Sequence, residues 1–119
     1  MDKVNLKQKL SLFAGYWQPK IVGELNGQLV KLAKLKGEFV WHQHRDEDEL
    51  FMVLHGELII RLRDRDVTLQ PGELMIIPRE TEHLPVAAEE VHIMLFEPAS
   101  VVNTGDTASD MTLEKLDRI

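Results

Sequence analysis

The chain has 119 residues, of which 44 % are hydrophobic and 29 % are charged, and it contains no cysteine. This length suits one domain, and the composition excludes wholesale disorder. Without cysteine the chain has no disulfides, thiolate zinc sites or cysteine nucleophiles. Its formal net charge of -6 argues against nucleic-acid binding through a basic surface. The basic residues at near-alternating spacing are interpreted as solvated strand edges: Lys31, Lys34, Lys36, Arg61, Arg63 and Arg65.

The hydrophobic runs are all short. None approaches the roughly 20 residues that a membrane-spanning helix needs. The apolar stretch from Ser11 to Trp17 is too short for a signal peptide, and Lys7 and Lys9 interrupt the segment before it. We therefore expect a cytoplasmic protein with no membrane contact.

Helical spacing marks the first fifteen residues, where Val4, Leu6, Leu10 and Phe13 share one stripe and Gly15 supplies a stop. From Pro19 onward the period changes to two. Strands are predicted over 21–25, 28–36, 38–43, 50–54, 57–63, 67–69, 73–77, 83–87 and 91–96. Asn26-Gly27 indicates a hairpin between the first two strands, and residues 88–90 are predicted to form a turn between the last two.

Many short strands at regular intervals, with no helical pattern between them, are typical of a β-sandwich or β-barrel. The small polar residues of 99–112 predict a loop, followed by a short helical turn over 113–119 capped by Thr112 or Asp110. The predicted organisation is an N-terminal helical segment (1–18), an all-β barrel (19–98) and a C-terminal tail (99–119).

All five histidines fall between residues 42 and 92. His42 and His44 stand two apart in a predicted strand, so both imidazoles face the same way and can share an ion. Two motifs contain this pair and a later histidine. They are Gly37-x4-His42-x-His44-x4-Glu49-x6-Gly56 and Gly72-x5-Pro78-x-Glu80-x2-His83-x3-Ala87.

These motifs resemble the two motifs of the cupin superfamily, and the resemblance extends over residues 37–98. It implies a double-stranded β-helix, or jelly-roll barrel. It also implies a metal site whose ligands map onto His42, His44, Glu49 and His83. Asp48 is a rival to Glu49, although only Glu49 has the family's spacing to Gly56. The sequence departs from the family in the position of the first glycine, in Glu80 where a glycine is usual, and in Ala87 where an asparagine is usual.

Three imidazoles and one carboxylate suit a borderline divalent ion, namely Fe, Mn, Zn, Ni, Co or Cu. Four protein ligands leave coordination positions open for water or substrate, which is typical of a catalytic site. Phe51 and Val53 share the strand parity of Glu49, so we expect them to line the barrel interior with the metal. His55, beside the turn at Gly56, is typical of a rim or surface residue. His92 is open to two interpretations, a pocket residue or a core histidine with its hydrogen bonds satisfied.

The leading hypothesis is a small cupin that holds one divalent ion and binds a small oxygen-rich metabolite such as a sugar or diol. The resemblance implies activities that range over sugar isomerases of the mannose-6-phosphate isomerase kind, dioxygenases, decarboxylases and non-enzymatic binders. The alternatives are a non-catalytic ligand-binding cupin and a metal-free structural one. A homodimer is expected, because small barrels expose sheet edges, with the apolar residues of 20–36 as the contact surface.

Overall fold

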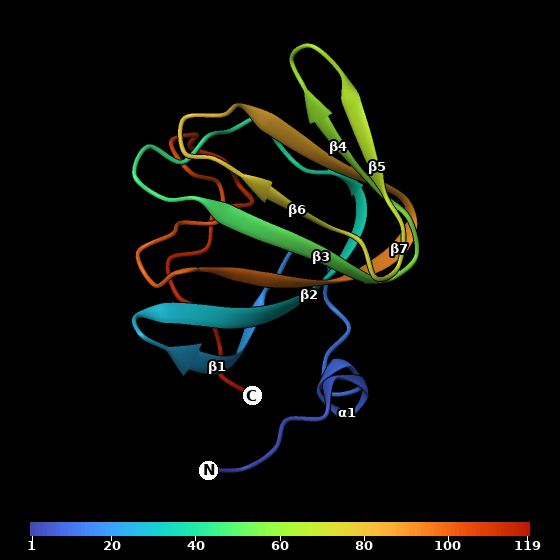
Figure 1. The fold of residues 1–119 in the computed structure, drawn as a ribbon, viewed down its shortest axis with the longest axis vertical. Coiled ribbons are helices and arrows are strands. Elements are labelled where there is room, and N and C mark those ends of the chain that lie inside the picture. Colours follow the sequence, from blue (N-terminus) through green and yellow to red (C-terminus); the bar gives the residue numbers. More distant parts are fainter.

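Along most of the chain after Pro19, side chains alternate between the interior and the exterior of the barrel. The strands that show this alternation pair into an all-β jelly roll (Figure 1). The computed structural model describes residues 1–119. Its elements are α1 (Leu6–Leu10), β1 (Lys20–Leu25), β2 (Gln28–Glu38), β3 (Glu49–His55), β4 (Leu58–Leu62), β5 (Asp66–Leu69), β6 (Leu74–Ile77) and β7 (His83–Pro98). The predicted fold class is confirmed. No helix of the structure is both long enough and apolar enough to cross a membrane.

The strands pair in the order β1-β2-β7-β3-β6, and β4 joins β7 on one side and β5 on the other. Every pairing is antiparallel. The hairpin between β1 and β2 turns at Asn26 and Gly27, both with positive φ, as the sequence predicts. Apolar side chains from both halves of the jelly roll form one core, which includes Val53, Leu58, Ile60, Val91 and Ile93.

β7 is one continuous strand of 16 residues, so the predicted turn at 88–90 is wrong. Its first part pairs with β4, where Val86 faces Ile59, and its later part pairs with β3, where Ile93 faces Val53. The exposed Glu89 lies between these two parts, near the register shift against β2. The polar residues therefore mark the corner at which one strand passes between the two halves of the barrel.

The predicted strand over 38–43 is also corrected. β2 continues to Glu38, after a register shift next to Gly37, whose φ of 87° is left-handed. The chain then leaves the sheet as a loop over 39–48, in which only His42 makes an isolated bridge, to His83. This loop carries two of the predicted metal ligands.

Both ends of the chain depart from the predictions. The N-terminal helix is confirmed but spans only Leu6–Leu10, because none of its side chains is buried and so no packing extends it. The helical turn predicted over 113–119 is absent. Instead Ile21 N donates to Asp117 O and Ile119 N donates to Ile21 O, so the tail lies along β1 (Figure 1).

Candidate metal centre

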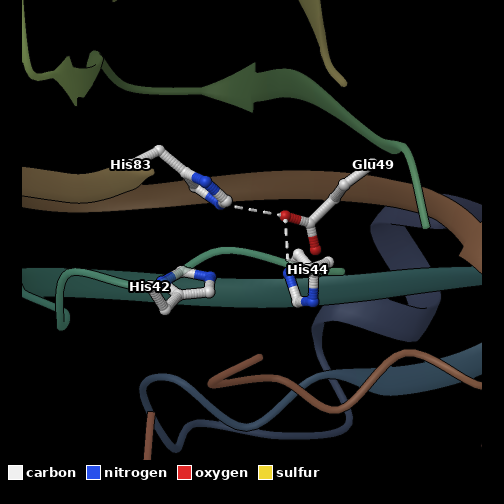
Figure 2. A group of neighbouring side chains, drawn as sticks. All are labelled: His42, His44, Glu49 and His83. Atoms are coloured by element: carbon white, nitrogen blue, oxygen red, sulfur yellow. Dashed lines mark hydrogen bonds and ion pairs between the residues drawn. The ribbon is translucent and has the colours of Figure 1, made fainter. Parts of the chain in front are cut away.

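The side chains of His42, His44, Glu49 and His83 converge inside the barrel, each with its ligand atom within 4.8 Å of the others (Figure 2). They come from three places: the loop over 39–48, the first residue of β3 and the first residue of β7. All four are buried, with exposed fractions of 4 % or less. An ion bound at about 2.1 Å holds its ligand atoms no more than about 4.2 Å apart, so a small contraction suffices to close the site.

Backbone hydrogen bonds hold the ligand loop against β7. His42 N donates to His83 O at 3.1 Å, and His83 N donates to His42 O at 2.9 Å. Glu80 N donates to His44 O at 2.7 Å. Glu80 adopts a φ of 63°, so it keeps the left-handed turn for which glycine is the usual residue. Glu80, one of the three departures from the family motif, therefore adopts the backbone conformation that is typical of glycine.

Two of the imidazoles are oriented by the backbone. His42 Nδ1 lies 2.8 Å from Val40 O, and His83 Nδ1 lies 2.8 Å from Thr81 O. A carbonyl oxygen accepts only, so each Nδ1 carries a proton and each ring turns its Nε2 toward the cluster. This is how proteins orient histidines that bind metals.

The remaining contacts bring the Nε2 atoms of two imidazoles to one carboxylate oxygen. His83 Nε2 lies 3.2 Å from Glu49 Oε1, and His44 Nε2 lies 3.4 Å from the same oxygen (Figure 2). His44 Nε2 is buried and has no hydrogen-bond partner within the protein. A ring nitrogen this close to a carboxylate oxygen needs a cation between the two atoms, either a proton or a metal ion. The donor set therefore fits a borderline divalent metal.

The electrostatics favour ligands that are ready to bind. Burial lowers the pKa of His42 to about 4, with a further contribution from His83, so this imidazole is neutral at pH 7. Burial alone would raise the pKa of Glu49, but the close contacts of this carboxylate with Glu97, His44 and His83 outweigh burial and hold that pKa well below its usual range. Glu49 is therefore the ionised carboxylate of the cluster.

The other histidines and acids of the motif region lie elsewhere. Asp48 is exposed and pairs with Arg79, whose Nε lies 3.2 Å from Asp48 Oδ1. His55 and His92 lie next to each other outside the cluster, with ring centroids 5.0 Å apart and ring planes tilted by 38°, and His92 Nε2 lies 2.7 Å from Glu90 Oε2. None of these three residues, Asp48, His55 and His92, lies with the buried ligands.

A cavity of about 40 Å³ adjoins the cluster and is lined by His42, Glu49 and Phe51 together with residues of β2 and β7. Phe51 lines this cavity, as its strand parity suggests. Val53 is fully buried in the apolar core and His92 is partly exposed, and neither lines the cavity. The N-terminal segment contributes Trp17, and the C-terminal tail contributes Asn103 and Leu116.

Two charged residues of the cavity wall are absent from the sequence prediction. Lys31 and Glu97 are each 2 % exposed and form an ion pair, with Lys31 Nζ 2.7 Å from Glu97 Oε1. The interpretation of Lys31 as a solvated strand residue is therefore wrong. A usable signal was present, because Lys31 shares strand parity with Leu29, Ala33 and Leu35, which all face inward.

The carboxyl group of Glu97 interacts electrostatically with that of Glu49 in the metal cluster. Burial raises its pKa well above the usual range, and the neighbouring charge of Glu49 raises it further, while Lys31 opposes both. Two carboxyl groups side by side cannot both ionise easily. A cation on Glu49 would relieve this repulsion.

Comparisons with known proteins agree with this fold. A family model described as the cupin domain matches residues 28–98. The crystal structure of a cupin-2 domain containing protein from Shewanella frigidimarina NCIMB 400 is 48 % identical, with a TM-score of 0.79, over 80 % of this chain and 93 % of that one. Protein NMB1881 from Neisseria meningitidis is 29 % identical, with a TM-score of 0.75, over 82 % of this chain and all of that one.

A curated relative is the uncharacterized protein YdbB of Bacillus subtilis (strain 168), which is 43 % identical over 63 residues. The match covers 52 % of this chain and 56 % of that protein, so it spans little more than half the length of either. The family model, by contrast, extends over all the strands from β2 to β7. The chain therefore belongs to the cupin domain family.

Proposed function

We propose that this protein binds one divalent transition-metal ion through His42, His44, Glu49 and His83, and holds a small oxygen-rich molecule beside it. The observation that carries the proposal is the convergence of four buried ligand atoms within 4.8 Å of one another. The buried Nε2 of His44, which has no partner within the protein, supports it. A bound ion would act as a Lewis acid toward an oxygen of the ligand.

The chain's own residues define what such a site accepts. The backbone carbonyls of Val40 and Thr81 fix two imidazole rings, so the ligands need little reorganisation when an ion binds. The cavity beside them is small and has apolar walls that include Phe39 and Phe51. It therefore favours a compact molecule over an extended polymer.

Metal analysis tests the proposal. Protein purified and then loaded with Mn²⁺, Fe²⁺, Co²⁺, Ni²⁺, Cu²⁺ or Zn²⁺ should retain about one ion per chain after dialysis. The His83→Ala variant should lose about 100-fold or more in affinity. The matched control is His92→Ala, which removes a histidine outside the cluster and should leave metal binding unchanged. A chain that retains no ion under any loading would overturn the proposal.

A second measurement separates an enzyme from a binder. Fe²⁺-loaded protein would be tested for O₂ consumption with small diols and phenols, and Mn²⁺- or Zn²⁺-loaded protein for aldose–ketose interconversion. Turnover that disappears in His83→Ala would support an isomerase or dioxygenase. Metal binding without turnover in either assay would favour the non-catalytic ligand-binding cupin.

A further inference from the structure

The wall of the cavity carries a row of charged side chains across three strands. The register that pairs Leu50 with Phe96 puts Glu49 of β3 opposite Glu97 of β7. Leu29 of β2 pairs with Glu97 in turn, so Lys31 stands diagonally beside it, two residues further along β2. The row Glu49–Glu97–Lys31 therefore runs from the metal cluster into the cavity, which all three residues line.

Lys31 and Glu97 have unused hydrogen-bonding capacity. Glu97 Oε1 accepts from Lys31 Nζ, whereas Glu97 Oε2 is buried and accepts no hydrogen bond within the protein. The ammonium of Lys31 has three N–H donors, and its one hydrogen bond is to Glu97. A buried polar atom that lacks a partner is costly, so natural proteins rarely retain one without a purpose.

A purely structural role explains the pair poorly. The side chains next to Lys31 and Glu97 on the same inward faces are apolar, as shown by Ala33 and Leu95. Apolar residues would continue this packing, and replacing a buried ion pair by apolar residues is often neutral or stabilising. The pair is therefore better explained by recognition of something in the cavity.

The size and charge of the cavity restrict its occupant. A volume of about 40 Å³ admits only a small molecule. With a cation on Glu49 to relieve the repulsion between the two carboxyl groups, Glu97 balances the charge of Lys31, so this wall offers no net positive charge to an anion. A carboxylate ligand would also face the negative oxygens of Glu97. A neutral molecule that both donates and accepts hydrogen bonds fits this wall.

We propose that Lys31 and Glu97 recognise the small molecule of the metal site, and that it is a hydroxycarbonyl compound or vicinal diol. Glu97 Oε2 accepts a hydrogen bond from one hydroxyl group, and Lys31 Nζ donates to the oxygen on the adjacent carbon. The inference rests on the proposed metal-binding function and deepens it. It names a substrate class and two specificity-determining residues outside the four ligands.

The test uses Co²⁺-loaded protein, whose visible absorption reports changes around the ion. Hydroxyacetone and acetone are the probes, because they differ only in the hydroxyl group. Wild-type protein should respond to hydroxyacetone at a concentration at least tenfold lower than to acetone. The Lys31→Met/Glu97→Met variant should retain about one Co²⁺ per chain but lose this preference. Removing both charges together avoids leaving either one buried and unpaired.

The matched control is Lys20→Met/Asp117→Asn, which removes another lysine–carboxylate pair, 3.3 Å apart, neither member of which lines the cavity. This variant should keep the tenfold preference. Should the cavity double variant fail to fold, Lys31→Leu/Glu97→Leu, which removes the same two charges with more compact side chains, gives the same comparison. Either cavity variant retaining the wild-type preference within twofold overturns the inference.

Metal content distinguishes failure of the recognition role of Lys31 and Glu97 from failure of the proposed metal binding. Wild-type protein that takes up Co²⁺ but responds equally to hydroxyacetone and acetone would overturn the recognition role of Lys31 and Glu97 alone. Protein that takes up no ion would overturn the proposed function, and the recognition role would fall with it.

Discussion

At the scale of single residues, the charge state of His42 is set by the fold. A histidine in the unfolded chain titrates near pH 6.5, whereas burial lowers the pKa of His42 to about 4. Between these values the unfolded chain binds a proton that the folded chain does not. Acidification therefore favours the unfolded state in this window. Above pH 6.5 His42 adds nothing to the pH dependence of the free energy of unfolding.

We predict that the metal-free protein loses up to about 3 kcal/mol of stability through His42 as the pH falls from 6.5 to 4. Denaturant unfolding at several pH values, with a chelator present, measures this loss. The His42→Gln variant is the control, and its stability should change less over the same window. The lowered pKa of Glu49 also costs stability on acidification, and the raised pKa of Glu97 has the opposite sign.

Glu49 and Glu97 both remain in the His42→Gln variant. The difference between the stability–pH profiles of wild type and variant therefore reports the contribution of the His42 imidazole to first order. Parallel profiles for wild type and variant would contradict the depressed pKa. A steeper profile for the variant would contradict it as well.

The four candidate metal ligands could be predicted because their spacing along the sequence resembles a family motif. Lys31 and Glu97 could not be found in that way. They lie 66 positions apart in the chain, and only the pairing of β2 with β7 brings them together. The alternation along β2 indicates that Lys31 faces inward, whereas its charged side chain is typical of a solvated position.

At the scale of elements, the C-terminal tail supports the loop that carries two metal ligands. Asp106 N donates to Gln43 O at 3.1 Å, and Thr107 Oγ1 donates to Trp41 O at 3.0 Å. Gly105, with a φ of 57°, packs directly on this loop. A Cβ atom at this position would lie 2.1 Å from Gln43 O and 3.3 Å from His42 Cδ2.

We predict that Gly105→Ala displaces the ligand loop, destabilises the protein by about 3 kcal/mol and weakens metal binding about tenfold or more. Gly105 has a left-handed backbone conformation that alanine adopts only with strain. The new Cβ atom would also clash with the backbone of Gln43, which cannot move aside as a flexible side chain could. Thermal unfolding and metal titration measure the two effects.

Gly27→Ala is the matched control, because Gly27 has a φ of 78° but open space around its Cβ position. It should cost about 1–2 kcal/mol through backbone strain and leave metal affinity unchanged. Equal metal affinity in Gly105→Ala and Gly27→Ala would show that the tail does not position the ligands.

The elements that were predicted wrongly depend on contacts distant in sequence. The acidic residues around Glu89 are typical of a turn, yet they occupy the corner of a strand whose two parts have different partners. Residues 113–119 have the pattern of a helical turn, but their backbone groups hydrogen-bond to β1 instead. The strands of each hairpin were located well, because local alternation and turn residues determine them.

At the scale of the whole molecule, the homodimer stays a prediction, but the structure changes the surface we assign to it. Most apolar side chains of 20–36 are buried in the barrel, among them Leu29, Leu32 and Leu35, and only Leu25 is largely exposed. The edge of β1 is also bridged by the C-terminal tail. An interface formed by that surface would therefore have little apolar area to bury.

The opposite edge of the sheet offers more. β6 pairs only with β3, and its outward side chains Leu74 and Ile76 are 52 % and 58 % exposed. Leu50 and Met52 of β3 lie beside them in register and are half-buried. These four residues form a continuous apolar patch next to an unpaired strand edge, which is typical of a surface that a second copy covers.

We predict that the protein is a homodimer in solution and that Leu74→Lys/Ile76→Lys converts it to a monomer, measured by light scattering after size-exclusion chromatography. The charged side chains would be desolvated in the interface with no partner, which costs far more than their apolar burial gains. The control Leu25→Lys places a similar charge on the other edge and should remain dimeric. Dissociation by Leu25→Lys alone would return the contact to the surface of 20–36, and a monomeric wild type would exclude both surfaces.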